Sequence, residues 1–243
     1  MCGRFNVTAD PLSALLMQLL DISYPGGDRF NIAPTETVPV LRQGEQGEPE
    51  LVPMRWWLTP FWAKESGTRY SMFNAKSESA ARSPAFREPY RKRRCVVPIS
   101  GFYEWAKGRL DGEPVKLPYL IRPAEAVAEG GAALLLAGLW DRWRDPKAAE
   151  DAPLLESFTI LTTVANPALE FVHHRQPVML SVADARRWLD METPTQELED
   201  LYDSVLPMSL EAVPVSTFVN NARNDGERCV TPVGDALLIG ANP

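Results

Sequence analysis

Residues 93–105 have the sequence RRCVVPISGFYEW, in which β-branched and aromatic side chains dominate. Such side chains pack well on a pleated surface, so we expect a strand over 94–105. Similar runs between Pro and Gly breaks predict further strands at 37–41, 51–58, 117–122, 132–141, 157–165, 177–180, 213–219 and 235–239. The chain is therefore expected to be rich in β-sheet.

Helices are expected to flank these strands. Asp10 and Pro11 suit the cap and first position of a helix over 11–21, whose apolar face would be formed by Leu12, Leu15, Leu16 and Leu19. Ser181 with Asp184 resembles a capping box for a helix over 182–190. Short helices are predicted at 77–82 and 84–90, and loops at 106–116, at 142–156 and over most of 21–50. The pattern predicts an α+β fold, a single domain over 1–243 with a central, mostly antiparallel β structure and flanking short helices.

Composition excludes several classes of protein. The chain has 243 residues and a net charge of −7, with 45% hydrophobic and 23% charged residues, as is usual for a globular protein. No apolar run approaches the ~20 residues that a membrane span needs, and the N-terminal MCGRFNVTAD lacks the features of a signal peptide. Three widely spaced cysteines do not indicate a disulfide framework. We therefore expect a cytoplasmic protein, without a membrane partner.

Charge is distributed unevenly along the chain. Residues 55–94 contain ten basic and three acidic side chains, so this segment carries 10 − 3 = +7 and the remainder carries −7 − 7 = −14. The acidic total argues against nucleic acid as a partner, but a local basic segment can still bind a polyanion. A solvated basic face is the alternative interpretation of the same segment.

Cys2 is the first candidate for chemistry. The initiator Met is normally removed before a small residue, which would leave a cysteine with a free α-amine and a thiol on adjacent carbons. The α-amine has an ordinary pKa of ~7.7–8.0 and the thiol ~8.5. Such a 1,2-aminothiol can attack an acyl carbon, or condense with an aldehyde to an imine and then a five-membered thiazolidine. The alternative is an incidental second residue.

Four further positions could take part in acid–base chemistry or in positioning. His173 and His174 are the only histidines, so any histidine-based proton transfer must use one of them. Glu104 lies among aromatic residues, where a carboxyl group has a raised pKa and can donate a proton; an exposed strand end is the alternative. Asn74 would either cap a helix or position a substrate.

Neither a metal site nor a phosphate-binding loop is predicted. The cysteines and histidines lack the spacing of zinc ligands, and no glycine-rich phosphate loop is present. We therefore expect no metal and no cofactor. Tryptophans such as Trp62 near the basic segment suit a surface that stacks single-stranded bases, although most tryptophans are expected in the core.

Nine segments in order resemble the SOS-response-associated peptidase family: MCGRF, FNIAPT at 30–35, RWWLTPFWAK at 55–64, FNAKSES at 73–79, RRCVVPISGFYEW at 93–105, AGLWD at 137–141, FTILTTVAN at 158–166, HHRQPVML at 173–180 and VSTFVNNARND at 215–225. The resemblance runs essentially from end to end. It implies a compact mixed domain, which agrees with the fold predicted from the strands and helices.

The resemblance also implies an activity. Members of this family bind abasic sites in single-stranded DNA, crosslink to them through a thiazolidine at the N-terminal cysteine, and remove their own initiator Met. It implies a monomer with autopeptidase activity, lyase activity at the abasic site, and association with the nucleoid when bound to damaged DNA. The implied catalytic residues are Cys2, Asn74, Glu104 and His173. The implied DNA-binding residues are Arg4, Trp62, Lys76, Trp105 and Arg175.

The sequence departs from the family pattern at three positions. Lys76 replaces the usual arginine, which keeps the charge but loses bidentate phosphate geometry. His174 stands where an acidic residue is common, and Gln176 where Met or Arg is common. Because the two histidines are adjacent, the assignment of His173 rather than His174 depends on alignment to the motif.

Two other functions fit parts of the sequence. An N-terminal-nucleophile hydrolase such as a glutamine amidotransferase also begins Met-Cys-Gly, but the chain has no Asn-Gly pair for its oxyanion hole. A non-covalent reader of modified or single-stranded DNA would use the basic segment alone, and its binding would not depend on Cys2.

Overall fold

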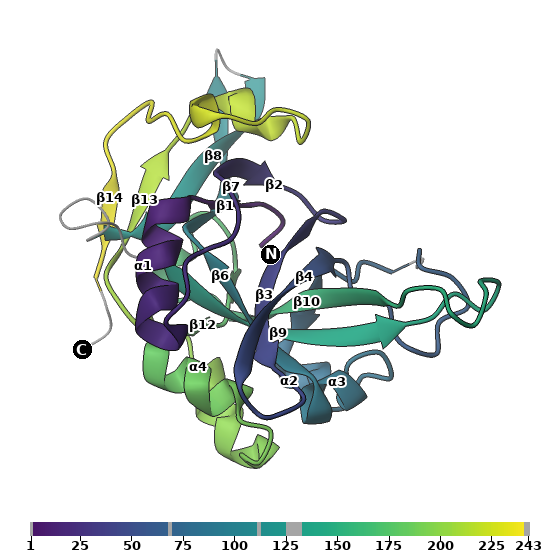
Figure 1. Ribbon diagram of the computed structural model, residues 1–243. Helices are drawn as coiled ribbons and strands as arrows, with labels where there is room; N and C mark the ends of the chain where they lie inside the picture. Colours follow the sequence, from purple (N-terminus) through teal and green to yellow (C-terminus); the bar gives the residue numbers. More distant parts are fainter. Residues whose placement is uncertain (1, 68–69, 111–112, 125–132, 241–243) are drawn as a thin grey trace.

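Two β-sheets form most of the computed structural model, which describes residues 2–67, 70–110, 113–124 and 133–240 (Figure 1). One sheet has six strands in the order β14-β13-β8-β7-β1-β2, and the other has eight. In the second sheet β9 pairs with β10 as well as with β6, so the strands β10-β4-β3-β6-β9 close into a barrel. Among the described pairings only those of β10 with β4 and β5 are parallel. A single compact α+β domain, mostly antiparallel, confirms the fold class expected from the sequence.

The chain contributes strands to the two sheets in blocks: β1–β2, β7–β8 and β13–β14 to the six-stranded sheet, and β3–β6 and β9–β12 to the other. Their bounds are β1 (Phe5–Val7), β2 (Arg29–Ile32), β3 (Thr37–Gln43), β4 (Pro49–Trp56), β5 (Asn74–Lys76), β6 (Arg94–Ile99), β7 (Gly101–Leu110), β8 (Glu113–Pro123), β9 (Leu134–Trp143), β10 (Leu155–Val164), β11 (Arg175–Pro177), β12 (Met179–Leu180), β13 (Leu210–Pro214) and β14 (Leu237–Ile239).

Short helices cover the sheets. The α-helices are α1 (Ala9–Leu20), α2 (Ser77–Ala80), α3 (Arg87–Lys92) and α4 (Val182–Leu189), and the 3₁₀ helices are η2 (Pro167–Leu169), η3 (Thr195–Tyr202), η4 (Thr217–Asn220) and η5 (Glu227–Cys229). Among the described helices, none combines the length and apolar character needed to cross a membrane.

The strand expected over 94–105 is two strands in different sheets. β6 lies in the barrel between β3 and β9, whereas β7 lies in the six-stranded sheet between β8 and β1. The chain crosses over at Ser100, whose N–H donates to the Asn6 carbonyl at 2.9 Å. A Cβ atom at Gly101 would lie 2.8 Å from the Ile121 carbonyl oxygen, so this close approach of two strands requires glycine. Residues 93–105 therefore join the two sheets.

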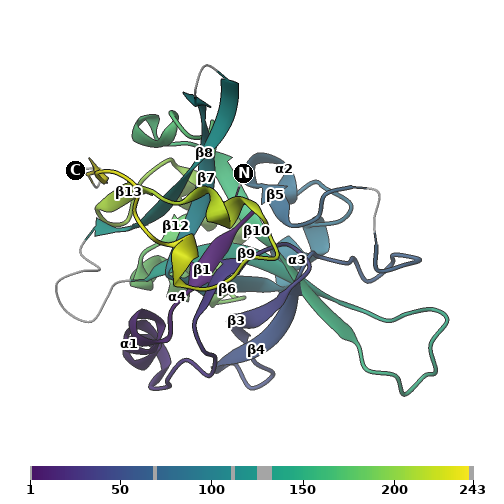
Figure 2. The ribbon, with the colours of Figure 1, turned by 90° about the horizontal axis from the view of Figure 1, so that it is seen from above.

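The hydrophobic core holds the start of the chain between the sheets. Phe5 is buried against the fully buried Trp56, with ring centroids 4.7 Å apart, and Trp56 stacks on Phe158. Burial of aromatic rings of this size contributes roughly 2–3 kcal/mol each. Because β1 is fixed in this way, the N-terminus lies between the six-stranded sheet and the barrel (Figures 1 and 2).

Two further local predictions were wrong, and one was confirmed. Helix α1 begins at Ala9, and its N-cap is Thr8 rather than Asp10, because Asp28 accepts the Ala9 N–H at 2.8 Å. Residues 106–116 are not a loop, since β7 and β8 pair as far as Leu110 and Glu113. Their charged side chains are compatible with a strand pair that extends into solvent. The cap of α4 is confirmed: the Ser181 hydroxyl accepts the Asp184 N–H.

Candidate active site

Cys2 is buried and lies three residues before β1, which pairs with β7. Phe5 pairs with Phe102, and the Tyr103 N–H donates to the Arg4 carbonyl at 2.8 Å. The same antiparallel register, continued toward the N-terminus, brings Gly3 beside Glu104 and Cys2 beside Trp105. Burial, and next the negative charge of Glu104, raise the pKa of the Cys2 thiol, so the thiol is protonated at neutral pH. The fold thus places Cys2 and Glu104 in one site.

Asn74 approaches Cys2 from the barrel. It begins β5, which pairs in parallel with β10, and its Nδ2 donates to the Cys2 carbonyl at 2.7 Å. Its Oδ1 is buried and accepts no hydrogen bond within the described part of the chain. The side chain caps no helix, because the N-cap of α2 is Lys76. Asn74 therefore fixes the backbone of Cys2 and offers an acceptor beside it.

Glu104 points into the interior from β7. The side chain is 5% exposed, and burial raises its pKa to about 7. Its neighbours Tyr103 and Trp105 belong to a separate cluster with Leu120 and Val213, as strand alternation predicts for the opposite face. Near neutral pH this carboxyl group is divided between its acid and base forms. It can therefore both give and accept a proton.

The raised pKa of Glu104 predicts a pH-dependent stability. Between pH 4.5 and 7 the unfolded chain releases a proton that the folded chain keeps, so the free energy of unfolding falls as pH rises through this window. The full effect is about 3 kcal/mol at 1.36 kcal/mol per pKa unit. Urea unfolding at pH 4.5 and pH 8 measures it. The free energy of unfolding of Glu104→Gln minus that of wild type should be about 3 kcal/mol more positive at pH 8 than at pH 4.5. The same value at both pH values would contradict the prediction.

His173 lies in the loop between η2 and β11, and its ring stacks on His174 with centroids 4.3 Å apart. Burial, with a contribution from His174, lowers the pKa of His173 to about 4, so the ring is neutral at pH 7. The Arg175 N–H donates to its Nδ1 at 3.0 Å. Nδ1 is thus the acceptor, and Nε2 carries the ring hydrogen. His174 is exposed, which distinguishes the two histidines physically.

Arg4 and Trp105 lie against each other, close in the chain to Cys2 and Glu104 respectively. The Arg4 guanidinium lies 5.7 Å from the Trp105 ring centroid, and its Nη1 donates to Asn31 Oδ1 at 2.7 Å and to the Val219 carbonyl at 3.0 Å. The Trp105 indole N–H donates to Asn220 Oδ1 at 2.7 Å. These bonds fasten η4 against β1 and β7, with one cation and one aromatic ring at the edge of the site.

The remaining DNA-binding candidates lie in different surroundings. Lys76 is exposed two residues after Asn74 on β5, and the Trp62 ring is 55% exposed in the loop that follows β4. Arg175 is buried and makes a bidentate ion pair with Glu78, with N···O distances of 2.8 and 2.9 Å, and it also donates to Thr162. A phosphate group would have to compete with Glu78 for this guanidinium.

The chain was compared with known proteins. A model of the SOS response associated peptidase (SRAP) family matches residues 1–222. The chain belongs to the SRAP family. It is 31% identical over 235 residues to the abasic site processing protein YoqW of Bacillus subtilis, covering 95% of this chain and 99% of that protein. It is 34% identical to the abasic site processing protein HMCES of Gallus gallus, covering 84% of this chain and 66% of that protein.

Solved structures share the fold of this SRAP domain. A protein from Bacteroides thetaiotaomicron superposes with a TM-score of 0.72 at 21% identity, over 96% of this chain and all of that one. A phage-related protein from Bordetella bronchiseptica has a TM-score of 0.63 at 28% identity, over 85% of this chain and 90% of that one.

Sequence reasoning missed two residues that organise the SRAP site. Asn31 is buried and donates to the carbonyls of Val219, Asn221 and Asn224 while it accepts from Arg4. Glu78 holds Arg175 from 97 positions away. The signal available for Asn31 in the sequence was its place in the FNIAPT motif, between two apolar residues. The ion pair between Glu78 and Arg175 could not be inferred from neighbouring sequence. The two residues come together only because β5, which precedes Glu78, and β11, which contains Arg175, both pair with β10.

The basic segment 55–94 is not one surface. Arg94 is buried and donates to the carbonyls of Trp188, Tyr90 and Asp190, so it fixes the end of α4. Arg93 lies 3.1 Å from the buried carboxylate of Asp141. The positive charge available at the surface to a polyanion is therefore smaller than +7, because Arg93 and Arg94 interact with groups inside the fold.

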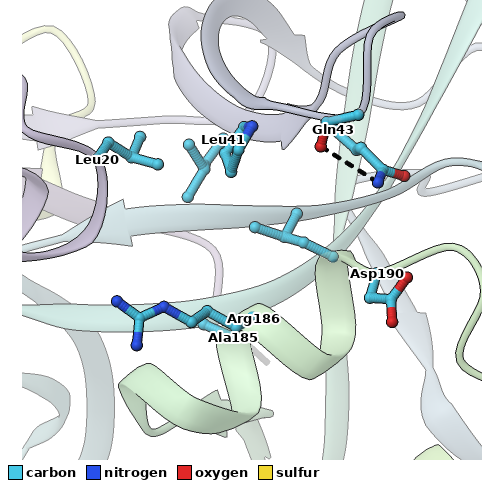
Figure 3. Close-up of a pocket in the computed structure, with 9 residues that line it drawn as sticks. Leu20, Leu41, Gln43, Ala185, Arg186 and Asp190 are labelled. Atoms are coloured by element: carbon cyan, nitrogen blue, oxygen red, sulfur yellow. Dashed lines mark hydrogen bonds between the residues drawn. The ribbon is translucent and has the colours of Figure 1, made fainter.

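A separate hollow of about 260 Å³ lies between α1, β3 and α4 (Figure 3). Its walls are mainly apolar, with Leu20, Leu41 and Leu189, and Gln43 at its edge donates to the Gly47 carbonyl. No residue expected in the SRAP site lines it. Cys2, Cys95 and Cys229 are free thiols, and the described residues contain no group of three or more metal-ligating side chains.

Proposed function

We propose that this protein crosslinks itself to abasic sites in single-stranded DNA through a thiazolidine formed by Cys2 after removal of Met1. The observation that carries the proposal is the convergence on Cys2 of Asn74, at 2.7 Å from its carbonyl, and of a carboxyl group with a pKa of about 7, Glu104. The names of the relatives YoqW and HMCES, both abasic site processing proteins, supply the substrate class.

The amine of Cys2 is the first nucleophile in this proposal. The buried thiol is protonated at neutral pH, whereas an α-amine with a pKa of ~7.7–8.0 is partly free. The amine nitrogen adds to the aldehyde carbon of the opened abasic sugar and gives a carbinolamine. Loss of its hydroxyl group as water leaves an imine. The imine carries a proton on its nitrogen as it forms, so sulfur bonds to the imine carbon while the thiol gives up its proton to a base, and the overall reaction of aldehyde with aminothiol releases one water.

Glu104 and His173 move the protons. Glu104 in its acid form protonates the departing hydroxyl group, and the resulting carboxylate accepts the thiol proton as sulfur adds. His173 presents Nε2–H, because its Nδ1 accepts the Arg175 N–H. It donates a hydrogen bond to the sugar oxygen as the ring opens to the aldehyde. In this scheme Arg175 acts through His173, whose loop it fixes by its ion pair with Glu78.

DNA would bind around this site through cations and aromatic rings. Arg4 and Trp105 lie at one edge, Lys76 at another, and Trp62 in the loop that leads to Asn74. Phosphate contacts from lysine and arginine supply affinity without regard to sequence, and exposed aromatic rings stack bases. An abasic site has no base of its own, so recognition would depend on backbone contacts, on neighbouring bases and on the aldehyde.

Removal of Met1 precedes crosslinking in the proposal. Cleavage of the Met1–Cys2 peptide bond frees the α-amine that the aldehyde requires. Asn74 holds the Cys2 carbonyl, and its buried Oδ1 is an acceptor for the new amine. Glu104 is the general base available for this hydrolysis.

Intact-protein mass spectrometry tests the proposal. The purified protein should lack Met1, and incubation with an abasic single-stranded oligonucleotide should add the mass of the oligonucleotide less one water. An oligonucleotide with a tetrahydrofuran in place of the abasic sugar is the control, because it has no aldehyde, and it should add nothing. A protein that lacks Met1 and binds the abasic strand without any covalent product would overturn the proposal in favour of a non-covalent reader.

A further inference from the structure

The loop between β4 and β5, described at residues 57–67 and 70–73, ends beside the active site. It follows Trp56 in the core and returns to Asn74, the residue that contacts Cys2. Its base is closed by the Leu58 N–H, which donates to the Met72 carbonyl at 3.2 Å, and by the Trp56 indole, which donates to the Phe73 carbonyl at 2.9 Å. The loop is therefore closed at its base next to Asn74.

The loop carries two aromatic rings on a tight turn. The Ala63 N–H donates to the Pro60 carbonyl at 2.9 Å, so Phe61 and Trp62 occupy the two corner positions. Their side chains are 56% and 55% exposed, whereas Pro60 and Ala63 on either side of them are buried. The base of the turn is thus embedded in the protein while both rings are presented to solvent.

Strand β9 holds this turn at two points. The Phe61 N–H donates to Asp141 Oδ2 at 3.0 Å, and the Trp143 indole N–H donates to the Ala63 carbonyl at 2.7 Å. Asp141 and Trp143 lie two residues apart on β9 and therefore share a face. Asp141 is 1% exposed, and its other oxygen lies 3.1 Å from Arg93 Nε. The loop runs beside the β9–β10 pair in Figure 1.

We infer that Asp141 and Trp143 are positioning residues for DNA: they hold the Phe61–Trp62 turn so that its rings stack on bases flanking the abasic sugar. The inference rests on the proposed function and adds to it the residues that prepare the stacking surface. Exposed aromatic rings on an unrestrained loop would lose conformational entropy on stacking. A turn fixed in advance avoids that loss, which strengthens binding without any new contact to DNA.

The chemistry at Cys2 does not need these two residues. The side-chain bonds of these residues within the described part of the chain run to other groups: Asp141 bonds to Phe61, Arg142 and Arg93, and Trp143 to Ala63. Their substitution should therefore raise the DNA concentration that gives half-maximal crosslinking and leave the maximal rate unchanged. This division separates a positioning role from a general loss of folding, which lowers the active fraction at every DNA concentration.

The experiment measures crosslinking rate against the concentration of an abasic single-stranded oligonucleotide for wild type, Trp143→Phe and Asp141→Ala. Stacking contributes roughly 1–3 kcal/mol per base, and loss of part of it in Trp143→Phe should raise the half-saturating concentration about five- to tenfold. The maximal rate should stay within about twofold of wild type. Asp141→Ala should have a larger effect of the same kind, and if it does not fold, Trp143→Phe decides alone.

Trp188→Phe is the matched control. Trp188 is buried, and its indole N–H donates to the Cys95 carbonyl at 2.9 Å under α4. Trp188→Phe also removes a hydrogen bond from an indole N–H to a backbone carbonyl, but at a site distant from the Phe61–Trp62 turn. It should therefore leave the half-saturating DNA concentration at the wild-type value. An equal rise in Trp188→Phe and Trp143→Phe would overturn the inference.

A double-mutant cycle tests whether the effect passes through the rings. In a Phe61→Ala/Trp62→Ala background, Trp143→Phe should have no further effect on the half-saturating concentration. An undiminished effect in that background would contradict the inference. If wild type forms no adduct, the proposed function fails; if wild type crosslinks and Trp143→Phe matches it at every DNA concentration, the positioning role alone fails.

Discussion

Replacing Cys2 with serine is expected to abolish the stable crosslink to abasic DNA while leaving DNA binding intact. Serine keeps the size of the side chain and the α-amine, so the imine can still form. Its hydroxyl group does not give a stable ring in place of the thiazolidine, because oxygen is a weaker nucleophile than sulfur and the ring it forms reopens readily. The wild-type adduct should survive denaturation, whereas less than about 1% of the serine variant should remain linked, a loss of at least 10².

Borohydride reduction separates the two chemical steps. The reagent converts an imine to a stable amine and does not act on a closed thiazolidine. Cys2→Ser and Cys2→Ala should therefore become linked to abasic DNA only when borohydride is present, and the product should be two hydrogens heavier than an imine. Intact mass must first show that Met1 is absent from each variant, because a retained Met1 blocks the amine.

The conservative matched variant for this experiment is Cys95→Ser. Cys95 is also a buried free thiol, but it lies in β6. Its substitution should leave the adduct unchanged. A stable adduct in Cys2→Ser that forms without borohydride would show that the thiol is not the second nucleophile. An adduct lost in Cys95→Ser but kept in Cys2→Ser would move the chemistry to another cysteine.

The clearest strands in the sequence are continuous runs of apolar residues that are buried in the barrel. β6 and β9 are of this kind and were expected. β1 and β5 have three residues each and were missed. A three-residue segment becomes a strand only because partners distant in sequence, β7 for β1 and β10 for β5, supply its hydrogen bonds.

The same non-local pairing limits what could be inferred about the site. Cys2, Glu104 and Asn74 were chosen from residue type and from the family resemblance, and the structure brings all three together. That Arg175 is held by Glu78 instead of being free for phosphate depends on β5 and β11 both bordering β10. The turn of Phe61 and Trp62 depends on β9 in the same way. Sequence motifs identified the groups that we propose react, whereas the groups that orient them are identified by tertiary contacts.

Replacing Glu104 with glutamine should lower the maximal rate of crosslinking by about 10²–10⁴, the usual contribution of a general acid. The wild-type rate should be bell-shaped in pH. The reaction needs the α-amine without its proton, a form that dominates only above about pH 8, and Glu104 with its proton, a form that dominates only below its pKa of about 7. The product of the two fractions rises up to about pH 7 and falls above about pH 8. Both groups are in their active forms together most often between these two values, so the maximum should lie near pH 7.5.

The pH profile of Glu104→Gln distinguishes an acid from a structural carboxylate. Glutamine cannot lose a proton, so the falling limb should vanish and the residual rate should rise to a plateau above pH 8. Glu211→Gln is the control, because Glu211 is a half-buried carboxylate paired with Arg122 at 2.7 Å on β13 and β8, and its profile should match wild type. Single-turnover rates at saturating DNA from pH 5.5 to 9 measure this. A falling limb that persists in Glu104→Gln would assign the acid to another group, and the neutral His173, with its pKa near 4, could not supply it because it is already deprotonated throughout this range.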